Sequence, residues 1–84
     1  MFSLSVCLIV KNEEKVLKRC LSCVKHFADE IIVVDTGSTD KTKEIAKTET
    51  ENVYDFKWVN DFSEARNFSF SKATCDFVMW VDAD

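Results

Sequence analysis

Two stretches of the chain, residues 4–10 and 30–35, are mostly apolar and have the length of a β-strand. The second contains four consecutive β-branched residues, which favour extended backbone. Runs that are apolar at successive positions are typical of strands buried on both faces of a parallel sheet. Residues 52–56 and 76–81 are two further stretches of strand length, the first with alternating apolar side chains. The pattern therefore predicts four strands, of which the third is the weakest.

Segments with helical periodicity separate these strands. Residues 13–26 carry a broad apolar stripe on one side, which we expect to pack on the sheet. Residues 41–47 and 62–72 predict two shorter helices in the next two intervals. The stripe of the first helix consists of Val16, Leu17, Cys20, Leu21, Cys23, Val24 and Phe27.

A polar side chain that can act as an N-cap precedes each predicted helix. Asn12 precedes the first helix, whose first turn is acidic, as the helix dipole favours. Asp40 precedes the second helix and Asp61 the third. Glu64 follows Asp61 by three positions, which is the spacing of a capping box.

The regular alternation of strands and helices indicates an α/β fold of three layers, with a parallel four-stranded sheet and helices on both faces. Two strand orders are compatible with this alternation. In the order 3-2-1-4, Asp35 and Asp82 end strands that lie two strand spacings apart, roughly 10 Å. In the order 2-1-3-4 the separation is three spacings, roughly 14 Å. We expect the order 3-2-1-4, because it places the two carboxylates better for a common ligand.

Composition and charge narrow the possible functions. The net charge of −4 argues against a nucleic-acid-binding protein, which needs a basic surface. The single glycine excludes glycine-rich dinucleotide and phosphate loops. No basic residue precedes Lys11, and residues 4–10 are too short to span a membrane. We therefore expect no export signal and a cytoplasmic location, with the cytoplasmic face of the membrane as an alternative.

The four cysteines include a Cys20-x-x-Cys23 pair, followed by His26. Such a pair can indicate a redox or zinc site, but a reactive dithiol is expected at a helix N-terminus. Because Cys20 and Cys23 both belong to the apolar stripe, we expect them to be buried thiols that form no disulfide and bind no metal.

Ligands of open parallel sheets bind beyond the carboxyl ends of the strands, where the strand order reverses. Asp82 and Asp84 follow the fourth strand with a spacing that places both carboxylates on one side of an extended segment, as a Mg²⁺ or Mn²⁺ site requires. A phosphoacceptor of receiver type would need an acidic pair after the first strand, where this chain has Lys11 and Asn12.

Four segments resemble the family 2 glycosyltransferases of the GT-A fold, in the same order and spacing. That resemblance implies an enzyme that transfers a sugar, as in a hexosyltransferase, from a nucleotide-diphosphate donor to an acceptor hydroxyl. It implies inversion at the sugar and a Mn²⁺ or Mg²⁺ cofactor. The segments are VCLIVKNEE (6–14), EIIVVDTGSTDKT (30–42), DFSEARNFSF (61–70) and FVMWVDAD (77–84).

The same resemblance implies roles for individual residues. The nucleotide would be bound by residues near the ends of the first two strands, in the third helix and in the fourth strand. Asp84 would bind the metal between the two phosphates, and Asp82 would contact either the ribose or the metal's water shell. Asp35 would accept a hydrogen bond from the ring nitrogen of uracil or contact the nucleoside in another way. The full nucleotide-binding set is Val10, Lys11, Asn12, Asp35, Arg66, Asn67 and Asp82.

The resemblance also implies that residues 1–84 form a single incomplete domain, the donor-nucleotide half of such an enzyme without its acceptor half. The general base of the family lies beyond Asp84, so no catalytic residue is expected here. A module that binds nucleotide and metal without catalysis is the alternative function. The fourth strand, 77–81, is apolar on both faces and lies at an edge, so we expect the 84 residues to form a homodimer through it.

Overall fold

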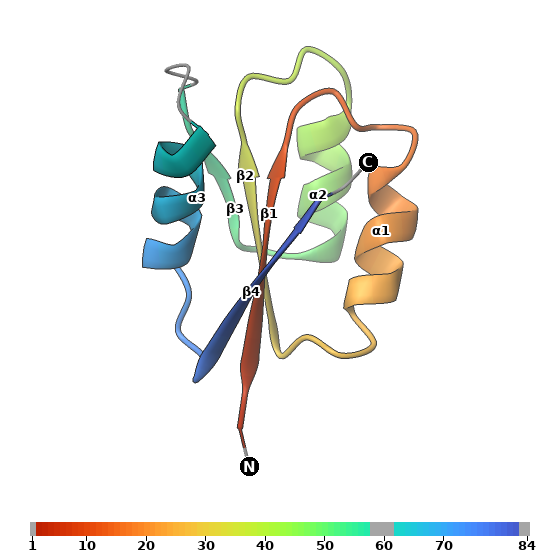
Figure 1. The fold of residues 1–84 in the computed structure, drawn as a ribbon. Helices are drawn as coiled ribbons and strands as arrows, with labels where there is room; N and C mark the ends of the chain where they lie inside the picture. Colours follow the sequence, from red (N-terminus) through yellow and green to blue (C-terminus); the bar gives the residue numbers. More distant parts are fainter. Residues whose placement is uncertain (1, 58–61, 83–84) are drawn as a thin grey trace.

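A computed structural model describes residues 2–57 and 62–82, in which strands and helices alternate (Figure 1). All four strands and all three helices that the sequence predicts are present. In chain order they are β1 (Leu4–Val10), α1 (Leu17–Val24), β2 (Glu30–Asp35), α2 (Thr42–Glu49), β3 (Val53–Asp55), α3 (Phe62–Ser71) and β4 (Phe77–Asp82).

The four strands form one parallel sheet in the order β3-β2-β1-β4. This confirms the predicted order 3-2-1-4 and excludes 2-1-3-4. Val10 at the end of β1 lies opposite Asp35 of β2, and Ile9 lies opposite Asp82 of β4. The reversal of strand order therefore lies between β1 and β4, with Asp35 and Asp82 in the two strands that flank β1.

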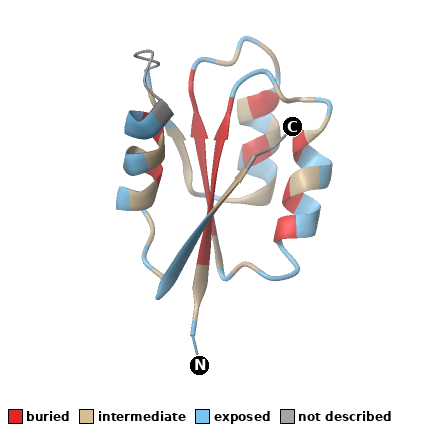
Figure 2. Ribbon diagram, in the orientation of Figure 1, coloured by how far each residue is buried: buried red, intermediate tan, exposed pale blue. Residues whose placement is uncertain are grey.

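Helices cover both faces of the sheet, α1 and α2 on one side and α3 on the other (Figure 1). Because side chains of a strand alternate between faces, β1 contributes to two separate cores. Val6, Leu8 and Val10 pack on the α1 and α2 side, with Leu17, Leu21 and Val24 of α1. Cys7 and Ile9 face α3, where they join Ile32, Val34 and Ala65. The central strands are the most deeply buried part of the molecule (Figure 2).

The first helix begins four residues later than predicted. Its N-cap is Val16, and Asn12 is not a helix cap at all, since its backbone has a positive φ of 53°. The chain between them turns toward the β2–α2 loop instead of continuing the helix. For α2 the N-cap is Lys41 and not the predicted Asp40, although the Asp40 carboxylate, one position earlier, accepts the N–H of Thr42, the first helical residue. The predicted cap Asp61 lies outside the described residues.

The buried stripe of α1 differs from the predicted one by the exclusion of its cysteine and aromatic members. Leu17, Leu21 and Val24 are buried, whereas Cys23 and Phe27 are exposed and Cys20 is half-buried. The prediction that both Cys20 and Cys23 are buried is therefore wrong for Cys23. The larger side chains of leucine bury more apolar area than cysteine and set the rotation of the helix. All four cysteines are free thiols in the structure.

Hydrogen bonds at the amino edge of the sheet join β1, β2 and the loop before β4. The Glu30 carboxylate accepts from the Ser5 hydroxyl and from both the N–H and the hydroxyl of Thr74. Burial alone raises the pKa of Glu30, but these hydrogen bonds outweigh it and hold the pKa below its ordinary value. Ser3 pairs in the same way with the Asp76 side chain. The start of β4 is thus tied to the start of β1.

The strand β4 forms one edge of the sheet and keeps an exposed apolar surface. Phe77 is 54% exposed, and Val78 and Met79 are each 43% exposed, although they point to opposite faces. None of the helices in the described part of the chain is long and apolar enough to cross a membrane.

We expect the 84-residue chain to associate through β4 into a symmetric dimer, because a flat apolar edge recruits another strand. Sedimentation velocity from low to high micromolar concentration measures this. Met79→Lys, which places a charge on the edge, should give a monomer throughout. A wild-type chain that stays monomeric at the highest concentration would contradict the expectation.

Candidate functional site at the carboxyl edge of the sheet

The candidate site is built around the ends of β1 and β2, which lie side by side. Val10 and Asp35 are partners in the strand register. Thr36, the residue after β2, donates both its N–H and its hydroxyl to the Val10 carbonyl, at 3.0 and 3.1 Å. These bonds extend the pairing of the two strands past their ends. The edge on which Asp35 stands is therefore rigidly held.

The Asp35 carboxylate is 3% exposed, and its two oxygens have different surroundings. Oδ1 accepts hydrogen bonds from the backbone N–H groups of Gly37 and Ser38, at 2.8 and 2.7 Å. Oδ2 is buried and, among the described residues, has no hydrogen-bond partner. Gly37 has a φ of 110°, a conformation that other residues adopt only with strain. One oxygen thus fixes the turn after β2, while the other has no hydrogen-bond partner among the described residues.

A set of hydrogen bonds, which we call the loop junction, joins residues 12–14 to residues 38–42. The Asn12 N–H donates to the Ser38 hydroxyl at 2.9 Å, and the Asn12 side-chain oxygen accepts the Thr39 N–H at 2.8 Å. The Glu13 N–H donates to the Thr42 hydroxyl at 2.7 Å. Sequence reasoning missed this junction, whose one visible signal is an Asn, a residue type that tolerates a positive φ.

Two carboxylates complete the loop junction. The Glu14 N–H donates to Asp40, and the Lys41 N–H donates to the Glu14 carboxylate at 3.2 Å. The hydroxyl of Thr42 also donates to Asp40 and, with backbone N–H groups, lowers the pKa of that carboxyl below its ordinary value. Asp40 is therefore occupied by structural contacts, as expected for a cap and not for a ligand residue.

The residues at the end of β1 and just after it that were predicted to bind the nucleoside lie at this edge, but they differ in exposure and in their contacts. The Val10 carbonyl and the Asn12 N–H are both engaged in the contacts above. Lys11 is exposed between them. The structure thus brings Val10, Lys11 and Asn12 next to Asp35. The Val10 carbonyl and the Asn12 N–H already form hydrogen bonds within the chain.

The predicted residues of α3 approach the site from the other face of the sheet. The Arg66 guanidinium lies over the Trp80 ring, 4.3 Å from its centroid, and is thereby held against β4. Asn67, the next residue, is exposed. Arg66 is thus brought beside the strand that ends in Asp82, whereas the side chain of Asn67 lies on the outer surface of the helix.

The predicted metal ligands stand at the limit of the described structure. Asp82 is the last residue of β4, and its backbone pairs with Ile9 beside the candidate site. Asp84 lies outside the described residues. The strand order therefore brings Asp82 to the same edge of the sheet as Asp35.

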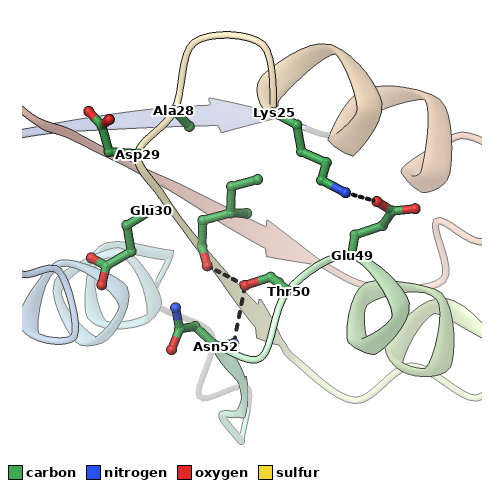
Figure 3. A pocket seen from close by; sticks show the side chains of 8 residues that line it. Lys25, Ala28, Asp29, Glu30, Glu49, Thr50 and Asn52 are labelled. Atoms are coloured by element: carbon green, nitrogen blue, oxygen red, sulfur yellow. Dashed lines mark hydrogen bonds and ion pairs between the residues drawn. The ribbon is translucent and has the colours of Figure 1, made fainter.

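A hollow lies at the opposite, amino edge of the sheet, between α1, α2 and β2 (Figure 3). Its charged and hydroxyl side chains are engaged in contacts within the chain, and the Asp29 and Glu30 carboxylates accept from residues outside the hollow. Lys25 and Glu49 form an ion pair of 2.7 Å, and Thr50 donates to the Ile31 carbonyl while accepting the Asn52 N–H. These contacts account for the hollow as a structural junction, and it is separate from the candidate site.

Known proteins resemble the chain over nearly its whole length. The model of the family "Glycosyl transferase family 2" matches residues 5–84. A TPR repeat-containing protein of Synechococcus elongatus is 44% identical over the whole chain, which covers 21% of that protein. The SPbeta prophage-derived glycosyltransferase SunS of Bacillus subtilis is 46% identical over 92% of the chain and 19% of its own length. The chain thus spans about a fifth of these relatives.

Solved structures also resemble the chain in fold. Glucosyl-3-phosphoglycerate synthase from Mycobacterium tuberculosis, solved with Mn²⁺, UDP and glucosyl-3-phosphoglycerate, superposes with a TM-score of 0.84 and 26% identity. The match covers 99% of this chain and 34% of the synthase. The same enzyme has also been solved with Mn²⁺ and UDP-glucose. With the match of the family model over nearly the whole chain, these findings show that the chain belongs to glycosyltransferase family 2 and has the GT-A fold.

Proposed function

We propose that this chain binds the nucleotide of a sugar donor, UDP-sugar, together with Mn²⁺ or Mg²⁺, for a glycosyltransferase. The observation that carries the proposal is the Asp35 carboxylate, whose Oδ2 is buried without a partner among the described residues. A buried acceptor without a hydrogen bond costs about 1–3 kcal/mol. A ligand that supplies an N–H at this position recovers that free energy.

The ring N3–H of uracil is a donor of the required kind. Uracil placed at the end of β2 would donate N3–H to Asp35 Oδ2, while its ribose and phosphates extend across β1 toward β4. The M. tuberculosis synthase, solved with UDP, supports the choice of base. Cytosine carries no proton on N3, so the lone pair of that nitrogen would face the carboxylate oxygen and repel it.

The acidic residues that follow β4 support a role for a divalent cation. A diphosphate would be repelled by Asp82 and Asp84 in a chain of net charge −4. Carboxylates are hard oxygen ligands that suit Mn²⁺ and Mg²⁺. We propose that Asp84 binds the cation and that Asp82 contacts the ribose or the water shell of the metal. The cation would neutralise the diphosphate and so stabilise it as a leaving group.

We also propose the reaction that this donor site serves. The sugar passes to an acceptor hydroxyl with inversion, and the general base is a carboxylate beyond Asp84, where the family resemblance places it. Residues 1–84 then form the donor-binding half of a larger enzyme in the cytoplasm, and by themselves bind the donor without transferring its sugar.

Titration calorimetry of the 84-residue chain with UDP tests the proposal. With Mn²⁺ present we expect UDP to bind at least tenfold more tightly than CDP, and excess chelator to abolish most of the binding. Asp84→Ala should weaken Mn²⁺-dependent binding as chelator does. Glu51→Ala, which removes an exposed carboxylate at the amino edge, is the control and should bind as wild type does.

Two results would contradict the proposal. Equal affinity for UDP and CDP would mean that no ring N–H reaches Asp35. Equal affinity for UDP with metal and with chelator would exclude a metal-bridged diphosphate. If sugar transfer were detected with the 84 residues alone, the placement of the general base beyond Asp84 would be wrong.

A further inference from the structure

We propose that Asn12 is a positioning residue, which orients the Asp35 carboxylate by holding the turn of residues 37–39. The inference rests on the proposed function, since it explains how the unpaired oxygen of Asp35 is kept available to the base. Asn12 does not contact Asp35. It acts through two consecutive residues of the turn, Ser38 and Thr39, whose hydrogen bonds are described above.

The first connection runs through Ser38. The Asn12 N–H donates to the Ser38 hydroxyl at 2.9 Å, and the Ser38 N–H donates to Asp35 Oδ1 at 2.7 Å. The side chain of Ser38 is thus fixed by Asn12, while its backbone fixes one oxygen of the carboxylate. Because the carboxylate is planar, holding Oδ1 also determines where Oδ2 points.

The second connection runs through Thr39. Its N–H donates to the Asn12 side-chain oxygen at 2.8 Å, and its hydroxyl lies 3.4 Å from the same oxygen. Two contacts on adjacent residues prevent the turn from rotating about either one. Gly37, whose φ is 110°, begins this turn and would otherwise allow it wide conformational freedom.

The backbone of Asn12 restricts which residue can serve here. A φ of 53° lies in the left-handed region, which Gly, Asn and Asp adopt most easily. Of these three, only Asn and Asp carry a side-chain oxygen that can accept the Thr39 N–H. Glycine therefore preserves the backbone, including the N–H that donates to Ser38, and removes only the side-chain contact with Thr39. Aspartate preserves both contacts.

Loss of the Asn12 side chain should loosen the turn at Thr39, since only the N–H contact with Ser38 remains, and let the Asp35 carboxylate reorient. Oδ2 would then sample orientations that do not meet the ring N–H of uracil, while the strands beneath remain intact. The preference for UDP over CDP depends on this one hydrogen bond between Asp35 Oδ2 and the ring N–H. We therefore expect Asn12→Gly to lower the ratio of the two affinities about tenfold, as for partial loss of one charge-assisted hydrogen bond.

The experiment compares Asn12→Gly with Asn12→Asp in the 84-residue chain. Calorimetry gives the ratio of UDP to CDP affinity, which a general loss of stability would not change selectively. Amide hydrogen exchange of Gly37 and Ser38, measured by NMR without nucleotide, reports whether the turn is held. We expect faster exchange and a reduced ratio in Asn12→Gly, and protection and a ratio close to wild type in Asn12→Asp.

The outcomes separate this inference from the proposed function. Wild-type exchange rates at Gly37 and Ser38 in Asn12→Gly would overturn the positioning role, whatever the nucleotide does. Faster exchange with an unchanged preference for UDP would also overturn it, since the turn would then not govern Asp35. If wild type itself does not prefer UDP, the proposed function fails, and the exchange rates still decide whether Asn12 holds the turn.

Discussion

Replacing Asp35 by asparagine is expected to weaken UDP binding about a hundredfold, without lowering the stability of the unliganded chain. Asn keeps the side-chain oxygen that accepts the N–H groups of Gly37 and Ser38. Its amide nitrogen then occupies the position of Oδ2. There it presents a donor to the ring N–H of uracil, so that an attractive contact becomes a repulsive one.

The substitution is expected to lower UDP affinity without lowering the stability of the unliganded chain, and this combination distinguishes a binding role of Asp35 from a structural one. Oδ2 is a buried charged atom with no partner among the described residues, so neutralising it relieves a desolvation cost in the free protein. We expect the melting temperature without nucleotide to stay the same or to rise. An amide flip does not rescue binding, because it would turn the NH₂ group toward two backbone donors.

Calorimetry with UDP and thermal unfolding without it measure both effects in one preparation. Asp29→Asn is a matched control. It makes the same chemical change at the amino edge of the sheet, where the Asp29 carboxylate accepts the Leu4 N–H. It should leave UDP affinity unchanged. Undiminished UDP affinity in Asp35→Asn would remove Asp35 from the nucleotide site.

The second large effect is expected in the core under β1. Leu8→Ala should lower the free energy of unfolding by about 3 kcal/mol, within the range for buried leucines in other proteins. Leu8 is fully buried in the central strand, among side chains of α1 and β2. A domain of this size has a total stability of roughly 4–13 kcal/mol, so the variant should be close to unfolding.

Urea denaturation measures this change, and Met79→Lys is the suitable background because it is expected to prevent association. Val78→Thr is the control, since it alters a strand residue that is 43% exposed. It should change the free energy of unfolding by no more than about 0.5 kcal/mol. If the two substitutions had similar effects, the core would not be centred on β1.

The sheet could be predicted from the sequence because its central strands are apolar at successive positions. Residues 4–10 and 30–35 have no polar face, and only a sheet covered on both sides buries such strands. The order of the strands followed from requiring that Asp35 and Asp82 address one ligand. Hydrophobic pattern and candidate chemistry thus converged on the same topology.

The rotation of α1 could not be predicted, because its apolar stripe is wider than the surface it covers. Seven apolar residues allow two neighbouring faces, and the contacts of Leu17 and Leu21 with the sheet select one of them. Cys23 is thereby left exposed. Tertiary packing selects which of the two faces is buried, and the periodicity of a single sequence carries no information about that packing.

The loop junction was missed for a different reason. An Asn before an acidic turn is as typical of an N-cap as of a left-handed residue. What distinguishes them here is a set of contacts with Ser38 and Thr39, 26 and 27 positions away. Asp35 shows the converse, because an Asp at the end of a strand is typical both of a turn cap and of a ligand-binding residue. In the structure one oxygen caps the turn, and the other leaves the second role open.

The strand order also governs when the molecule can fold during its own synthesis. β1 leaves the ribosome first, yet one of its two neighbours, β4, ends only at Asp82. At a translation rate of about 5–20 residues per second, the nascent chain spends roughly 4–14 s with β1 made and β4 missing. Throughout this interval the backbone groups on one side of β1 are unpaired. Slower translation would lengthen the period in which another chain, or a chaperone, can occupy the place of β4.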